Sequence, residues 1–201
     1  MRIGIDFDNT IVCYDQVFHA AARERELIPV EVPVSKEAVR NYLRSIDREE
    51  DWTKLQGYVY GPRMRDALPF AGVLEFFARC AEAQLPVWII SHKTRYPFQG
   101  PQYDLHESAR QWIADHGLLD ADRVGLPADH VFFELTKAAK LERVQQVGCT
   151  HFIDDLPEFL AEEDFPEGVQ RILFDPQDHH PDETRFLRAT SWAQVWELVK
   201  P

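Results

Sequence analysis

Short apolar runs alternate with longer amphipathic segments along most of the chain, and this alternation limits the fold more than any other feature. Runs of strand length, rich in Val, Ile and Phe, lie at residues 3–7, 87–90, 131–133, 151–153 and 171–174. Such runs are typical of strands buried on both faces of a parallel sheet. Segments of helical periodicity lie between them, at 70–83, 104–116, 137–147 and from 191 onward. The order predicts an α/β fold with right-handed crossovers and helices on both faces of the sheet.

The interval between the first run and residue 70 does not follow this alternation of strand-like and helix-like segments. It contains two helix-like stretches, 15–27 and 35–46, followed by a segment rich in Trp and Tyr. We interpret residues 15–68 as a small, mostly helical insertion into a core domain formed by residues 1–14 and 69–201. A chain of 201 residues suits one compact domain that carries a modest insertion.

Charge and cysteine content narrow the class of protein. The formal net charge of −12 argues against a nucleic-acid polymer as partner, because such binders replace phosphate counterions with Lys and Arg. A small phosphorylated ligand stays compatible, since a local metal ion can reverse the field. Cys13, Cys80 and Cys149 form no metal or disulfide motif, and the first apolar run is too short for a signal peptide or a membrane span. We expect a cytoplasmic protein that does not associate with membranes.

Pairs of carboxylates follow two of the predicted strands. Asp6 and Asp8 end the first run, and Asp154 and Asp155 end the fourth. The carboxyl ends of parallel strands are where open α/β sheets bind ligands. One acid in each place is explained by a solvated turn or by a helix N-cap. Two pairs on two strands of the same type instead favour a hard cation with oxygen ligands.

Two further polar residues accompany these strand ends. Ser91 ends the second run, and Lys137 opens the helical segment that leads into the fourth. A serine after a strand is most often a turn residue, and a lysine at a helix N-terminus opposes the helix dipole. Lys140 lies one helical turn further on, and spacing alone does not choose between the two lysines.

Taken together and in this order, Asp6/Asp8/Thr10, Ser91, Lys137 and Asp154/Asp155 resemble the motifs of the haloacid dehalogenase-like hydrolase superfamily. The resemblance covers the whole predicted sheet domain. It implies a three-layer Rossmann-like core with five parallel strands in the order 3-2-1-4-5. It also implies that the insertion is the small α-helical cap of that family.

The resemblance further implies a reaction. Asp6 is then the nucleophile that forms an aspartyl-phosphate, and Asp8 is the general acid and later the general base. Ser91 and Lys137 hold the transferring phosphoryl oxygens. Thr10 belongs to the substrate-binding loop, which it orders rather than reacting itself.

A Mg²⁺ ion is the cofactor that the resemblance implies. Its ligands are Asp6, the backbone carbonyl of Asp8, and Asp154 or Asp155. The ion offsets the repulsion between an anionic nucleophile and an anionic phosphate.

The expected substrate is a small phosphomonoester, such as a nucleotide or a sugar phosphate. His92, Lys93, Arg63 and Arg65 are the candidates to contact it. With Asp8 present, the chain resembles the phosphatase and phosphotransferase branches of the family rather than its dehalogenases, which lack this second acid. A phosphotransferase that uses the same residues and a non-catalytic member that binds metabolites or partners stay open as alternatives. The oligomeric state is also open, a homodimer included.

Overall fold

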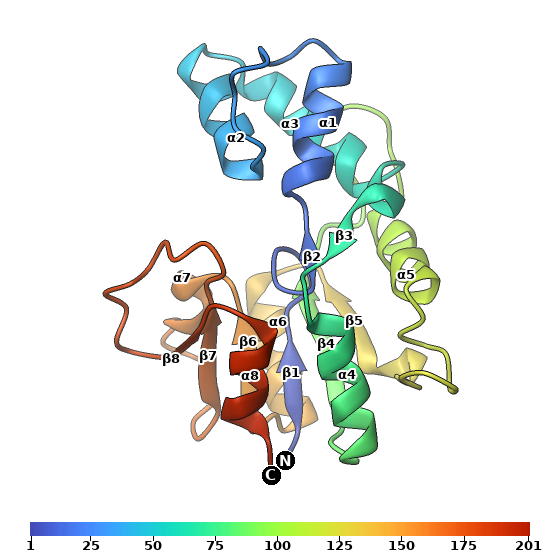
Figure 1. Cartoon of the computed structure of the whole chain (residues 1–201), viewed down its shortest axis with the longest axis vertical. Helices are drawn as coiled ribbons and strands as arrows, with labels where there is room; N and C mark the ends of the chain where they lie inside the picture. The colour runs from blue at the N-terminus through green and yellow to red at the C-terminus, as the bar shows by residue number, and fades with distance from the viewer. The chain divides into compact units, whose positions relative to one another are not determined.

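The computed structural model describes all residues, 1–201, and divides into two compact units. Unit 1 comprises residues 1–12, 69–92 and 117–201 and contains a six-stranded parallel sheet in the order β5-β4-β1-β6-β7-β8 (Figure 1). The strands are β1 (Ile3–Ile5), β4 (Val87–His92), β5 (Val131–Glu134), β6 (His151–Asp154), β7 (Gln170–Phe174) and β8 (Leu187–Ala189).

The predicted Rossmann-like sheet is confirmed, with one more strand than the sequence indicated. The five predicted strands are all present and lie in the order 3-2-1-4-5, and β8 pairs with the free edge of β7. The sequence did not indicate β8 because it is only three residues long and Ala189 alone is buried.

Helices cover both faces of this sheet. α4 (Val73–Glu82) and α8 (Trp192–Val199) lie on one face, and α6 (Lys137–Val147) and the single turn α7 (Pro157–Leu160) lie on the other (Figure 1). Side chains alternate along β7 and supply both layers. Phe174 packs against Trp192 of α8 at 5.2 Å between ring centroids, whereas Leu173 joins the cluster formed with Leu141 and Phe159.

Local signals set the bounds of the helix that matters most for the site. The side chain of Thr136 accepts a hydrogen bond from the backbone N–H of Ala139 at 3.1 Å and so caps α6. The helix ends at Gly148, whose φ of 67° lies in the left-handed region that glycine adopts without strain. The sequence predicted both ends.

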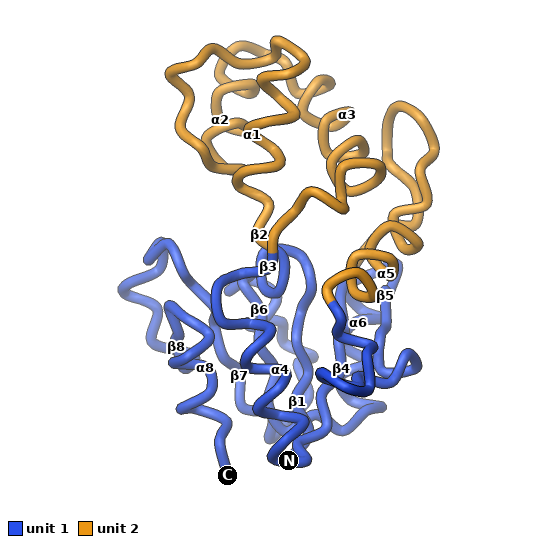
Figure 2. Tube along the Cα trace, turned by 45° about the vertical axis from the view of Figure 1, so that its right-hand side comes forward, with its two compact units in different colours: residues 1–12, 69–92, 117–201 blue, residues 13–68, 93–116 orange.

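Unit 2 comprises residues 13–68 and 93–116 (Figure 2). Its helices are α1 (Asp15–Glu24), α2 (Lys36–Ser45), α3 (Glu49–Tyr60), the short 3₁₀ turn Met64–Asp66, and α5 (Leu105–Asp115). The predicted insertion was 15–68. The structure groups residues 93–116 with it, because α5 packs on this segment: the indole Nε1 of Trp112 donates to the carbonyl of Ala67 at 2.8 Å. The chain passes between the units at the short strands β2 (Val12–Cys13) and β3 (Leu68–Pro69), which pair with each other, and after β4 and α5.

An aromatic cluster forms the core of unit 2. Phe18 lies 5.0 Å from Trp52 and 5.6 Å from Tyr60, and Tyr14 lies 5.0 Å from Tyr60, all between ring centroids. The two pairs that include Tyr60 are edge-to-face, and pairs of this kind add about 0.5–1.5 kcal/mol each beyond the burial of their area. The cluster therefore holds the ring of Tyr60 in one position.

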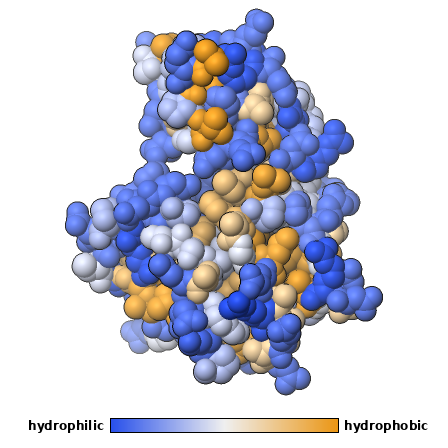
Figure 3. All heavy atoms as spheres, viewed as in Figure 1, coloured by the Kyte–Doolittle hydropathy of each residue, from blue (hydrophilic) through white to orange (hydrophobic).

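Hydrophilic side chains cover much of the face that Figure 3 draws. On the face drawn in Figure 3, apolar patches are separated by hydrophilic side chains. None of the helices combines the length and the hydropathy that a bilayer span requires.

The loop after β7 is held by a buried carboxylate. Asp175 accepts hydrogen bonds from the backbone N–H groups of His179 and His180 at 2.8 and 2.9 Å, and from Nε of Arg188 at 2.9 Å. Burial alone raises the pKa of Asp175, but these donors outweigh it and hold the pKa below the ordinary value of 3.8.

We expect Asp175→Asn to lower the free energy of unfolding at pH 7 by about 2–3 kcal/mol, because the amide cannot accept from all three donors. An acid whose pKa is lower in the folded state stabilises that state above the unfolded pKa, so the difference between variant and wild type shrinks as the pH falls below about 4. Urea unfolding at several pH values measures this. Asp182→Asn, a change at an exposed acid of the same loop, is the control; an equal loss in both variants contradicts the assignment.

Candidate active site

The chain turns sharply just after β1. Asn9 adopts a φ of 59°, in the left-handed region that Asn tolerates better than most residues. The backbone N–H groups of Ile11 and Val12 both donate to the carbonyl of Phe7 at 3.1 Å. This tight loop places Asp6, Asp8 and Thr10 at the carboxyl edge of the sheet.

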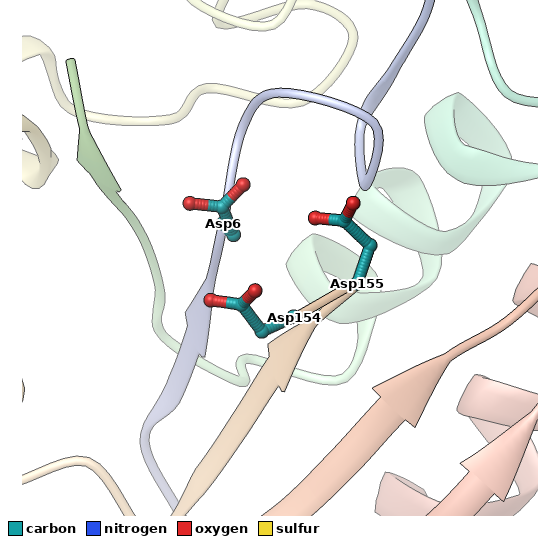
Figure 4. Close-up of side chains that lie close together, drawn as sticks. All are labelled: Asp6, Asp154 and Asp155. Carbon is teal, nitrogen blue, oxygen red and sulfur yellow. The ribbon is translucent and has the colours of Figure 1, made fainter. Parts of the chain in front are cut away.

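Carboxylates from two neighbouring strands meet at this edge. Asp6 follows β1, Asp154 ends β6, and Asp155 follows it; their side chains face a common space (Figure 4). Each offers an oxygen within 4.8 Å of the others. The pairing of β1 with β6 explains the approach, because the backbone N–H of Asp6 donates to the carbonyl of Ile153 at 2.9 Å. Thr10 helps to hold Asp155 in place, since the Oγ1 of Thr10 donates to Oδ1 of Asp155 at 3.3 Å.

A buried lysine bridges two of these acids. Nζ of Lys140 lies 2.6 Å from Oδ1 of Asp6 and 2.6 Å from Oδ2 of Asp154. Its Nζ also lies 4.0 Å from the ring centroid of Phe159 and 5.5 Å from that of Phe152, and only 2% of the residue is exposed.

Of the two lysines that the sequence left open, this geometry favours Lys140 over Lys137. Lys137 is the first residue of α6 and is exposed, whereas Lys140 is the first buried residue of that helix. Sequence periodicity could not choose, because each lysine is followed by apolar residues at helical spacing. The depth to which each turn of α6 is buried decides between them.

Burial and charge shift the ionisation of this cluster. Burial, with a smaller contribution from the neighbouring carboxylate of Asp154, raises the pKa of Asp6 to about 7; the ammonium of Lys140 offsets part of this effect. Burial disfavours the charged form of Lys140, but the carboxylates of Asp154 and Asp6 outweigh burial and raise its pKa. Lys140 is therefore an ammonium at neutral pH.

The donor set suits a divalent cation. Three carboxylates and one ammonium leave a formal charge of −2 when all the acids are ionised. Carboxylate oxygens are the ligands that Mg²⁺ and other hard cations prefer. Asp6, Asp154 and Asp155 are therefore the side chains that fit such an ion. A second hydrogen bond helps to fix the orientation of the Asp154 carboxylate, because its Oδ1 accepts from the backbone N–H of Leu156 at 2.9 Å.

Ser91 supplies a hydroxyl on the strand beside β1. It lies near the end of β4, is 1% exposed, and its Oγ has no hydrogen-bond partner in the protein. Buried hydroxyls nearly always have a partner, and an ordered water or a bound ligand can fill that role. An oxyanion bound at the same edge of the sheet would be such a ligand.

The imidazole of His92 is kept neutral at this edge. Burial lowers its pKa, and the ammonium groups of Lys140 and Lys137 act in the same direction. His92 can therefore offer a substrate a hydrogen bond but not a positive charge at pH 7.

The other predicted substrate contacts belong to unit 2. Arg63 pairs with Asp66 at 2.5 Å and with Glu24, and these hydrogen bonds raise its pKa further. Arg65 is exposed, and Lys93 is nearly buried with its Nζ 4.8 Å above the ring of Tyr60. A role in substrate binding stays a prediction for all three.

Sequence comparisons give no match. No family model matches the chain, and neither does any curated protein.

Solved structures resemble the chain along nearly its whole length. A haloacid dehalogenase-like hydrolase from Streptococcus pneumoniae superposes with a TM-score of 0.63 at 14% identity, covering 99% of this chain and 98% of that one. A phosphoserine phosphohydrolase-like protein from Francisella tularensis gives 0.56 at 13% identity, covering 98% and 99%. A structure described as a dehalogenase gives 0.57 at 13% identity, covering 100% and 97%. At such identities the likeness concerns the fold alone. The chain has the fold of the haloacid dehalogenase-like hydrolases.

Proposed function

We propose that the protein is a Mg²⁺-dependent phosphatase that hydrolyses a small phosphomonoester through an aspartyl-phosphate on Asp6. The observation that carries this proposal is the convergence of Asp6, Asp154, Asp155 and Lys140 at one sheet edge. Ser91 is the last residue but one of the neighbouring strand β4, at the same edge. This set provides a nucleophile, a cation site and two donors for phosphoryl oxygens.

Asp6 attacks phosphorus, and the bond from phosphorus to the leaving oxygen breaks as the new P–O bond forms. Lys140 and the hydroxyl of Ser91 donate to the equatorial phosphoryl oxygens and balance the charge that develops there. Lys140 also holds Asp6 in position by its hydrogen bond to Oδ1, which leaves Oδ2 as the oxygen for attack.

Asp8 serves as the acid and base of this proposal. It lies in the tight loop after β1, two residues beyond the nucleophile, and is half-buried. It gives a proton to the leaving oxygen in the first step. It then takes a proton from the water that attacks the aspartyl-phosphate, which regenerates Asp6 and releases phosphate.

A bound Mg²⁺ would supply positive charge that lets an anionic nucleophile approach an anionic phosphoryl group. Asp6, Asp154 and Asp155 would hold it with their side chains, and the backbone carbonyl of Asp8 is the further ligand that we propose.

A panel of phosphomonoesters tests the proposal. We expect release of inorganic phosphate from at least one sugar phosphate or nucleotide in the presence of Mg²⁺, and from p-nitrophenyl phosphate as a generic substrate. A purified, folded protein that releases no phosphate from any member of the panel contradicts it.

Removal of the metal ion gives a second test with a defined pH dependence. EDTA should abolish turnover, and Mg²⁺ at a hundred times its Kd should stabilise the fold by about 2.7 kcal/mol, which raises Tm by about 5–10 °C. Because the pKa of Asp6 is raised to about 7, the metal-free folded state keeps a proton that the unfolded chain releases near 3.8. The free energy of unfolding without metal therefore falls as the pH rises from about 4 to 7, while the affinity for Mg²⁺ rises.

Thermal unfolding with Mg²⁺ or EDTA at pH 5, 6, 7 and 8 measures this. The difference between Tm with Mg²⁺ and Tm with EDTA should grow with pH in the wild type. It should grow equally in Asp164→Asn, a control at an exposed acid, and should be smaller than in the wild type in Asp155→Asn. A Tm difference that is independent of pH contradicts the assignment of Asp6 as a ligand.

A further inference from the structure

An apolar cavity lies in unit 1, at the opposite end of the sheet from the candidate active site. Its volume is about 240 Å³, and it lies between the last turns of α4, the start of β4 and the loop before β5. Val87, the first residue of β4, lines the cavity, whereas Ser91 lies four residues further along the strand, a distance of about 13 Å. The cavity is therefore separate from the acids and the lysine of the active site.

The walls of this cavity carry no charged side chain. No Asp, Glu, Lys or Arg lines it, although these residues make up 28% of the chain. Phe77, Leu85 and Leu126 are among its apolar walls. Cys80 adds a buried thiol, and burial raises the pKa of this thiol to about 12, so it stays protonated. Such walls favour a neutral occupant, because an ion would lose its hydration there without gaining an ion pair.

Backbone hydrogen bonds hold the walls in place. The N–H of Leu85 donates to the carbonyl of Cys80 at 2.8 Å and fixes the turn that follows α4. The N–H of Leu126 donates to the carbonyl of Leu118 at 2.9 Å and fixes the loop before β5. The cavity is therefore formed before a ligand arrives, which lowers the entropy that binding costs.

One imidazole supplies the cavity with a fixed hydrogen-bond acceptor. His130 lines the cavity, and its ring stacks on that of Trp88 at 4.5 Å between ring centroids. Its Nδ1 lies 2.9 Å from the carbonyl oxygen of Val87, so Nδ1 carries the proton of the neutral ring. Nε2 is then an acceptor, and it has no hydrogen-bond partner in the protein. A ligand that donates one N–H or O–H group would satisfy it.

We propose that this cavity binds a small, neutral aromatic molecule that donates one hydrogen bond to Nε2 of His130. The volume sets the size of the ligand: an apolar cavity of about 150 Å³ holds a benzene ring, so 240 Å³ suits one ring or two fused rings. Two of the walls are themselves rings, those of Phe77 and His130, and contacts with them favour an aromatic ligand. The site is independent of the proposed phosphatase activity.

Indole and indene test the site, because they have nearly the same shape and differ in one N–H group. In ¹H–¹⁵N spectra we expect saturable shifts of the amides of Cys80, Val87 and Leu126 with both compounds, and a Kd about tenfold lower for indole. His130→Phe keeps a ring beside Trp88 and removes Nε2, so the two Kd values should become equal. Absence of saturable shifts at these amides overturns the site, and equal Kd values in the wild type overturn the proposed class of ligand.

A change that fills the cavity locates the ligand. Ala81→Leu adds bulk from an exposed position of α4 that lines the cavity, so it should raise both Kd values at least tenfold with little change in Tm. Ala193→Leu makes the same change at an exposed alanine of α8 and should alter neither Kd. Unchanged Kd values in Ala81→Leu place the compounds elsewhere and overturn the site. The comparison of the two compounds in the wild type decides the class of ligand even where His130→Phe does not fold.

Discussion

Asp6→Asn is expected to abolish phosphate release, with kcat lowered on the order of 10⁴-fold or more, because an amide cannot form the phosphoryl intermediate. The same change should leave the fold as stable as the wild type at pH 8, or slightly more stable. Burial raises the pKa of Asp6 to about 7, so the ionised carboxylate is unfavourable in the folded state without metal, and a neutral Asn removes that cost.

The measurement combines kcat for p-nitrophenyl phosphate with urea unfolding in EDTA. Asp164→Asn changes an exposed acid of the same unit and should alter neither quantity. A variant Asp6→Asn that retains turnover within tenfold of the wild type rejects Asp6 as the nucleophile. A variant that is inactive only because it unfolds is recognised from the urea curve.

Lys140→Met is the second change with a large expected effect. It leaves the buried carboxylates of Asp6 and Asp154 without their common cation, and loss of one partner of a buried ion pair costs about 3–5 kcal/mol. It also removes a donor to the phosphoryl oxygens, which lowers kcat by about 10²–10³-fold. The loss of stability should be smaller at pH 5, where Asp6 holds a proton, and smaller in Mg²⁺, which replaces the missing charge.

Lys137→Met is the matched control, because it removes the same charge from the exposed first turn of the same helix. We expect its free energy of unfolding to stay within about 0.5 kcal/mol of the wild type, with kcat nearly unchanged. The reverse pattern, a large loss of kcat in Lys137→Met and little in Lys140→Met, would restore the assignment made from the sequence.

The core of unit 1 could be predicted because its strands are buried on both faces. Residues 3–7, 87–90, 131–133, 151–153 and 171–174 are apolar almost throughout, so each run identifies a central strand and, at its carboxyl end, a place for the site. The sequence did not predict β8, because it is an edge strand with one buried residue and therefore carries no apolar run. A strand of that kind needs little apolar sequence.

The helices of unit 2 were less visible in the sequence. α3 looked like an aromatic segment, yet Trp52, Leu55 and Val59 are buried along one side of it at helical spacing. The sequence placed α5 among the crossover helices of the core, whereas Trp112 joins it to Ala67 of unit 2. Periodicity reports that a helix has an apolar face and does not say which partner covers it.

The sequence predicted that the acids of the candidate site lie close together, and it left Lys137 and Lys140 as alternatives for its lysine. Strand ends fix where Asp6, Asp154 and Asp155 lie, because the register of a parallel sheet aligns them. The choice between Lys137 and Lys140 depends on how deeply each turn of α6 is buried, which only the packed structure shows.

Trapping of the phosphoryl group on the protein tests the central claim most directly. The protein is mixed with a ³²P-labelled substrate from the panel and Mg²⁺, quenched in acid and digested, and the labelled peptide is sequenced by mass spectrometry. The account predicts a label on Asp6 that hydroxylamine removes and that EDTA prevents. A label on any other residue, or phosphate release at the normal rate with no label at any time point, would contradict it.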